Sequence, residues 1–130
     1  MMDNADCGSL MKLFFRFLVI LALTLGSAVA QQETPTSLAA SARTGNNVAL
    51  QELKAQASAG NASAQFNLGL MYASGEGVPK DFVIAYMWRN LASAQGEGIA
   101  KPARDALETM MTPAQIAEAQ KLSREWKPKK

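Results

Sequence analysis

The 36 residues NASAQFNLGLMYASGEGVPKDFVIAYMWRNLASAQG, residues 61–96, decide the fold of this chain. In their first third, apolar side chains recur at helical spacing, which predicts a helix with one apolar face over about 62–73. The residues on this face are Ala64, Leu68, Met71 and Tyr72. Gly69 lies within the same helix and costs about 1 kcal/mol relative to alanine. We therefore expect a neighbouring helix to approach closely at Gly69.

A loop and a second helix complete this stretch. Two glycines and a proline in Gly75–Pro79 predict a tight interhelical loop. Asp81 follows as the expected N-cap of the second helix. That helix is apolar on nearly every side, through Phe82, Ala85, Tyr86, Trp88 and Leu91. Such a helix must be covered on more than one side, as happens when helix pairs stack.

Flanking segments extend the stack in both directions. A helix over 47–59 ends near Gly60, and Gly60 lies 36 residues before Gly96, a spacing close to known helix-pair repeats. A short helix is expected near Pro102, and the threonine, proline and glutamine in Thr112–Gln115 form a clear start signal for the last helix. The prediction is an all-α chain, a short α-solenoid of antiparallel helix hairpins with about five to six helices.

The stretch 61–96 resembles the Sel1-like repeat, a relative of the tetratricopeptide repeat. The resemblance is carried by Ala64-Gln65, Leu68-Gly69, Met71-Tyr72, Gly75-x-Gly77-Val78, Asp81, Ala85, Trp88, Ala92 and Gln95-Gly96. It implies a helical repeat domain over 47–126, with one full repeat at 62–96 and capping helices at 100–126. Members of this family usually act as adaptors or scaffolds for protein complexes, although a single full repeat implies a shallow groove.

The N-terminal 30 residues have the pattern of a secretory signal peptide. Lys12 and Arg16 precede an apolar run from Phe17, and small residues end the segment at Ala30. The acidic first ten residues suit such a signal poorly, which favours Met11 as the true start. We expect a periplasmic or secreted protein of a Gram-negative bacterium, with no stable membrane insertion after cleavage. Residues 31–46 are expected to be a flexible segment with a short helix over 36–43.

Composition excludes several classes of function. The chain has no histidine, and its one cysteine, Cys7, lies in the predicted signal peptide, so the commonest general base and the usual transition-metal ligands are missing. We expect no cofactor, no metal site and no catalytic residue. A net charge of +2 is too small to indicate a nucleic-acid partner. The carboxylates left for catalysis are Glu76, Asp81, Glu97 and Glu108, which we interpret as loop, capping and surface residues.

The predicted function is therefore protein binding in the cell envelope, through exposed helix faces or the loop Gly75–Lys80, with an unknown partner. The residues that we expect to contact this partner are Glu76, Lys80, Arg89 and Trp126. Tyr72, Tyr86 and Trp88 are interpreted as core, and the basic tail 127–130 as solvated. Two alternatives stay open: a cell-wall-associated enzyme or accessory subunit acting on peptidoglycan, and a structural protein that associates weakly with itself.

Overall fold

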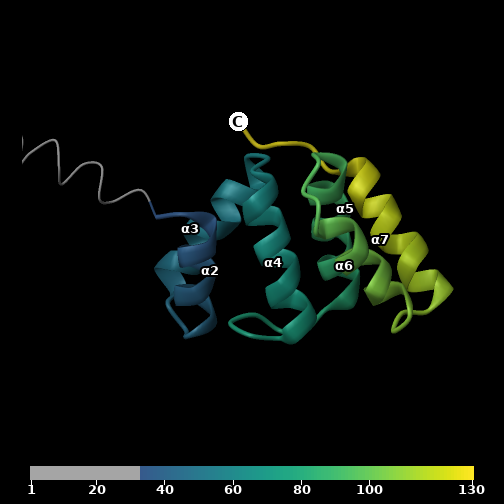
Figure 1. Cartoon of the computed structure of the whole chain (residues 1–130), viewed down its shortest axis with the longest axis horizontal. Helices are drawn as coiled ribbons and strands as arrows, with labels where there is room; N and C mark the ends of the chain where they lie inside the picture. The colour runs from purple at the N-terminus through teal and green to yellow at the C-terminus, as the bar shows by residue number, and fades with distance from the viewer. Residues whose placement is uncertain (1–32) are drawn as a thin grey trace, which may run out of the picture. The chain divides into compact units, whose positions relative to one another are not determined.

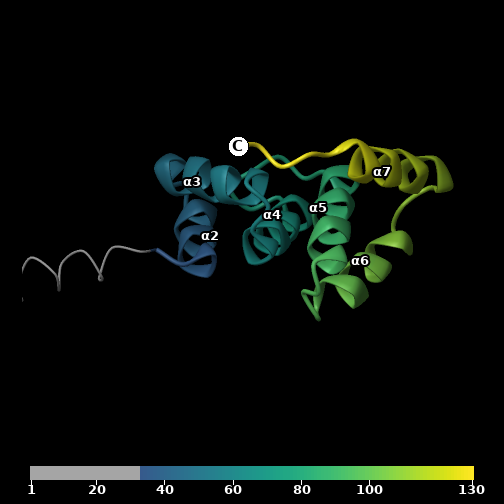
Figure 2. The ribbon, with the colours of Figure 1, turned by 90° about the horizontal axis from the view of Figure 1, so that it is seen from above.

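The computed structural model describes residues 33–130, and within them the chain forms six helices and no strand. The expected signal peptide, Met11 and Cys7 lie outside the described residues. In Figures 1 and 2, α2 and α3 lie together at one end of the described domain, α4 follows, and α5, α6 and α7 lie at the other end. They are α2 (Pro35–Arg43), α3 (Asn47–Ser58), α4 (Ala62–Ser74), α5 (Phe82–Ala94), α6 (Ala100–Glu108) and α7 (Pro113–Glu125). The predicted all-α fold is confirmed.

Local capping explains where most of these helices begin. The Asn46 side chain accepts from two backbone N–H groups at the start of α3, and Asn61 and Asp81 do the same for one N–H each in α4 and α5. At α7, Thr112 and Gln115 form a reciprocal capping box. Each cap satisfies a backbone donor that has no partner within the helix. The caps predicted at Asp81 and Thr112 are confirmed.

The 36-residue spacing seen in the sequence is also present in the backbone. At the end of α3, the N–H of Asn61 donates to Gln56 and that of Gly60 donates to Ala57. At the end of α5, the N–H groups of Glu97 and Gly96 make the same two bonds to Ala92 and Ser93, each position displaced by 36 residues. Gly60 and Gly96 both have the positive φ that this helix termination requires. The two helices therefore end in the same way.

The α4 and α5 helices approach each other closely at Gly69, as predicted. A Cβ built on Gly69 would lie 2.8 Å from Cγ of Arg89 and 3.1 Å from the carbonyl oxygen of Ala85. Both distances are shorter than ordinary van der Waals contact. The absence of a side chain at Gly69 thus sets how closely α5 packs on α4.

The N-terminal segment differs from the expectation. The predicted helix over 36–43 is present as α2, but from Pro35 onward the segment is not a flexible tether. Leu38, Ala39 and Ala42 of α2 are buried in the same cluster as residues of α3 and α4. The loop after α4 also packs on α2, because Cβ of an alanine at position 77 would lie 2.5 Å from the carbonyl oxygen of Ala42. Small apolar residues of α2 thus serve as core rather than as linker.

Two clusters of buried apolar residues hold the helices together. The first joins α2, α3 and α4 and contains Leu38, Leu50, Leu53, Leu68 and Met71 among its larger members. The second joins α5, α6 and α7 through Ala85, Tyr86, Leu107, Met111 and Ala119. Tyr72 is half-buried and packs against both clusters. It links the two halves of the stack at the α4–α5 hairpin.

Candidate protein-binding groove

The C-terminal segment turns back over the helices instead of leaving the domain. The N–H of Lys129 donates to the carbonyl oxygen of Ser58 at the end of α3, at 2.8 Å. In Figures 1 and 2 the segment runs from the end of α7 back across α5 and α4 towards α3. The expected solvated tail is therefore fixed along its backbone, although the lysine side chains of residues 127–130 are exposed.

A hollow of about 700 Å³ lies between this segment and the helices. One wall comes from α3, with Gln51, Lys54 and Ser58, and Lys129 and Lys130 of the tail also line it. Its apolar lining comes from α4 and α5, through Leu68, Tyr72 and Trp88. We call this hollow the groove. Its volume lies within the range of about 300–1,000 Å³ that is common for binding sites in proteins.

An aromatic pair holds the tail against the rim of the groove. The rings of Trp88 and Trp126 meet edge to face, with centroids 6.3 Å apart and planes at 73°. Such a pair contributes about 0.5–1.5 kcal/mol beyond the burial of its area. Trp126 itself closes α7 as its C-cap residue. The pair thus connects the last helix to the central hairpin at the point where the tail begins.

A buried glutamine fixes the helices on the α3 side of the groove. Gln65 is fully buried, donates through Nε2 to the carbonyl oxygen of Ala57 at 3.1 Å, and accepts from Nε2 of Gln95 at 2.7 Å. These bonds tie α4 to the end of α3 and to the end of α5. A buried amide with partners on both atoms favours one arrangement of the three helices.

Two of the four predicted partner-contacting residues, Glu76 and Lys80, lie in the exposed loop after α4, away from the groove lining. The carboxylate of Glu76 forms an ion pair with Arg43 of α2 at 3.5 Å. The ammonium of Lys80 lies 5.0 Å from the ring centroid of Phe82, and Lys80 borders a second hollow with Asp81 and Glu118. The structure therefore places Glu76 beside α2 and Lys80 beside α7. It does not bring either residue to Trp126.

Arg89, also predicted to contact a partner, is buried within the domain. Arg89 is only 7% exposed, and its guanidinium donates to the carbonyl oxygen of Ala103 at 2.6 Å. Its Nε atom is buried without a hydrogen-bond partner, and burial lowers the pKa of the guanidinium. The aliphatic stem packs beside Gly69, so the long side chain extends between α4 and α6. Helical spacing in the sequence did not reveal this, because the covering helix α6 comes later in the chain.

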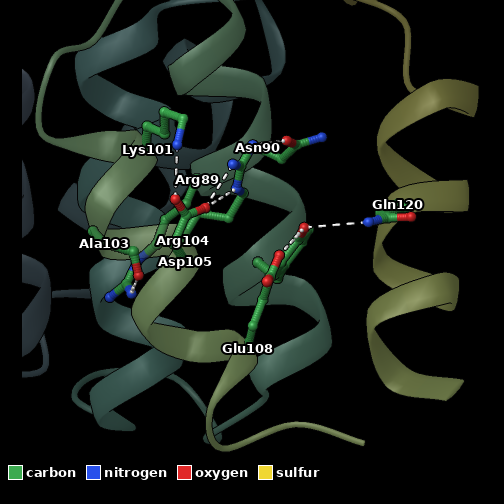
Figure 3. A network of polar contacts seen from close by, with 9 residues as sticks. Arg89, Asn90, Lys101, Ala103, Arg104, Asp105, Glu108 and Gln120 are labelled. Carbon is green, nitrogen blue, oxygen red and sulfur yellow. Dashed lines mark hydrogen bonds and ion pairs between the residues drawn. The ribbon is translucent and has the colours of Figure 1, made fainter. Parts of the chain in front are cut away.

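A polar network joins α5 to α6 and α7 on the other side of the domain (Figure 3). Arg104 donates to Asn90 at 2.8 Å and to Asp105 at 2.6 Å, and Lys101 donates to Asp105 at 2.9 Å. Hydrogen bonds from Lys101 and Arg104 lower the pKa of Asp105. The bond from Arg104 to Asn90 joins α6 to α5, whereas the two bonds to Asp105 lie within α6.

The hydroxyl of Tyr86 forms the second part of this network. It donates to Glu108 at 2.8 Å and accepts from Gln120 of α7 at 3.4 Å. Glu108 is thus a structural partner of a buried tyrosine, and Asp81 is a helix cap. With Glu76 paired to Arg43, three of the four carboxylates considered for catalysis have structural roles.

Within residues 33–130, no group of three histidine, cysteine or acidic side chains lies close enough to hold a metal ion. None of the helices in the same range is both long and apolar enough to cross a membrane. Among comparisons with known proteins, the family model of the Sel1 repeat matches residues 62–97. No curated protein and no solved structure matches the chain. The match coincides with α4, the loop and α5, and α4 and α5 form one side of the groove.

Proposed function

Since the chain contains a Sel1 repeat at residues 62–97, we propose that it is a non-catalytic scaffold of the cell envelope that binds another protein through the groove. The Sel1 repeat suggests a role in protein–protein interaction. The observation that supports the groove as the contact surface is its lining: Tyr72 and Trp88 are half-buried and face a hollow instead of being enclosed by the core. Tyrosine and tryptophan are enriched among the residues that dominate protein interfaces.

The position of the groove within the stack supports the same proposal. Helices α3, α4 and α5 all contribute to it, and these are the helices whose relative placement is fixed by Gln65 and by the close approach at Gly69. A surface built on rigid elements loses little conformational entropy when a partner binds. The envelope location rests on the N-terminal signal pattern, which precedes the described residues.

Site-specific photo-crosslinking in cells producing the full chain tests this function. A photoreactive phenylalanine analogue at Gln51, an exposed residue of the groove wall, should yield a covalent adduct with one partner protein. The matched control is the same analogue at Met110, which is 58% exposed and remote from the groove lining. Equal adducts at both positions, or none at Gln51 in folded protein, would contradict the proposal.

The envelope location has its own test. Fractionation of the producing cells should place the protein in the periplasm or the medium, and mass spectrometry should find a mature N-terminus at Gln31. Recovery of full-length protein from the cytoplasm would refute export and leave the groove proposal intact.

A further inference from the structure

We propose that the groove binds an acidic peptide segment that carries a bulky apolar side chain, an inference that rests on the proposed scaffold function. Among the side chains that line the groove, the charged ones are those of Lys54, Lys129 and Lys130, and none is acidic. A groove lined by one sign of charge attracts a ligand of the opposite sign and disfavours ligands of the same sign. The partner segment should therefore carry several carboxylates.

The three lysines come from parts of the chain that the fold brings together. Lys54 belongs to α3, whereas Lys129 and Lys130 reach the groove only because the tail returns over the helices. The bond from the N–H of Lys129 to Ser58 and the contact of Trp126 with Trp88 hold the tail there. The positive charge of the groove is thus a product of the tertiary fold and not of a local run of lysines.

The need for an apolar side chain in the ligand is inferred from the wall of the groove that α4 and α5 form. Leu68, Tyr72 and Trp88 lie together on α4 and α5, with Tyr72 and Trp88 half-buried. Leu68 is already buried, but a ligand that presented carboxylates alone would leave the exposed surface of Tyr72 and Trp88 in contact with water. An aromatic or aliphatic side chain would cover it and remove apolar surface from solvent.

The second hollow of the domain serves as an internal comparison. It is lined by Lys80 but also by Asp81 and Glu118, so its charges are of both signs. Because its charges are mixed, the second hollow should show no preference for an acidic ligand. The charge argument therefore singles out the groove formed with the tail.

Tryptophan fluorescence can test this directly, because Trp88 and Trp126 are the two tryptophans of the chain, Trp88 lines the groove and Trp126 contacts Trp88. The probe is a synthetic hexapeptide of four glutamates around two central phenylalanines, which contains no tryptophan. Titration into the full chain should change the emission in a saturable way, and raising the salt from about 0.05 M to about 0.5 M should weaken binding. The same peptide with lysines in place of the glutamates, or glycines in place of the phenylalanines, should bind at least about tenfold more weakly.

Charge-reversed variants assign the binding to the groove. The variant with Lys54→Glu, Lys129→Glu and Lys130→Glu should lose at least about tenfold in affinity for the glutamate peptide. The matched control carries Lys80→Glu, Lys101→Glu and Lys121→Glu, which gives the same net charge with exposed lysines outside the groove. It should lose less than about threefold. Circular dichroism verifies that both variants keep the helical fold.

Several outcomes would overturn the inference. Equal loss in both triple variants would show attraction to net charge alone, and equal binding of the lysine peptide would remove the charge argument. Vesicles of anionic lipid that compete fully with the peptide would identify a membrane surface as the ligand, and a concentration-dependent dimer that masks the tryptophans would identify a second copy. If the peptide does not bind while Gln51 still crosslinks to a protein, the scaffold function stands and the acidic ligand is wrong.

Discussion

The two halves of the domain are held together by different means. The cluster that joins α2, α3 and α4 consists of eleven buried apolar residues, whereas the cluster that joins α5, α6 and α7 has five. The second half compensates with hydrogen bonds from Tyr86, Arg89 and Arg104 to partners on neighbouring helices and turns. Apolar packing carries no charge that titrates or is screened, whereas contacts of ionisable side chains depend on pH and on ionic strength. The two halves should therefore respond differently to mutation and to solvent.

The largest expected effect is the loss of a core leucine in the first half. Leu53 is completely buried, and Leu53→Ala should lower the free energy of unfolding by about 2–5 kcal/mol because it leaves a cavity among other apolar residues. Leu107→Ala in the second cluster should cost less, since that cluster has fewer buried residues and the flexible Met111 can move into the space.

Urea unfolding followed by circular dichroism measures both variants, with Val48→Ala as control. Val48 lies on the same helix as Leu53 but is 79% exposed, so its truncation should change stability by less than about 0.5 kcal/mol. If Leu107→Ala costs as much as Leu53→Ala, the two clusters are equally well packed and the contrast between the halves fails.

A glycine series examines the contact between the α4–α5 loop and α2. Gly77→Ala should cost about 2–4 kcal/mol, because a Cβ would meet the backbone oxygen of Ala42 and the φ of +75° is left-handed. Gly96→Ala has a similar φ but open space around it, so it should cost only about 1–2 kcal/mol. Gly98→Ala has open space and no left-handed φ, and should be nearly neutral.

Thermal unfolding of the three glycine variants separates the steric cost at Gly77 from backbone strain alone. The expected order of melting temperatures is Gly98→Ala highest and Gly77→Ala lowest. Equal values for Gly77→Ala and Gly96→Ala would mean that the loop does not depend on its contact with α2.

In the second half, Tyr86→Phe removes the hydroxyl that joins α5 to Glu108 and Gln120. We expect a loss of about 0.5–1.5 kcal/mol, the usual net contribution of a hydrogen bond, because Glu108 is exposed and regains water. Tyr72→Phe is the control, since the structure shows no hydrogen bond from the Tyr72 hydroxyl within residues 33–130. A larger loss for Tyr72→Phe in urea unfolding would contradict the assigned role of Tyr86.

The smallest effect concerns alkaline pH. Burial is the largest cause of a raised pKa for both Tyr72 and Tyr86, above the ordinary value of 10.0. Because the folded state holds these protons more tightly than the unfolded state, their contribution to stability is complete below pH 10 and is lost as the pH rises through the folded values.

The chain has two tyrosines, so an ultraviolet titration of tyrosinate reports on these groups alone. Less than half of the tyrosinate signal should be present at pH 10.0 in folded protein, and about half in protein unfolded by urea. Half-ionisation of the folded protein at pH 10.0 would show that both hydroxyls reach solvent freely.

The sequence predicted those parts of the structure that depend on neighbouring residues. The N-caps Asp81 and Thr112, the loop at Gly75–Pro79 and the close approach at Gly69 all follow from signals within a few positions. Arg89 could not be placed in the same way, because its burial depends on α6, which helical periodicity alone does not position.

The candidate site was less predictable than the fold, for the same reason. Trp126 was identified as a partner-contacting residue, but its contact with Trp88 and the return of Lys129 to Ser58 join positions far apart in the chain. The basic tail looks in the sequence like an ordinary solvated end. No local pattern could have shown that it supplies part of a groove.

The matching ends of α3 and α5 have a consequence for how this architecture can change in length. Because the backbone leaves both helices through the same pair of hydrogen bonds and the same left-handed glycine, a duplicated copy of residues 61–96 would begin at a junction identical to the one that it leaves. Insertion of such a copy would move α6 and α7 outward as a unit and repeat the same helix ending at each junction, and the tail after α7 would no longer reach Ser58 of α3. The number of repeats is therefore a variable that gene duplication can alter, while each terminal helix continues to close its own end.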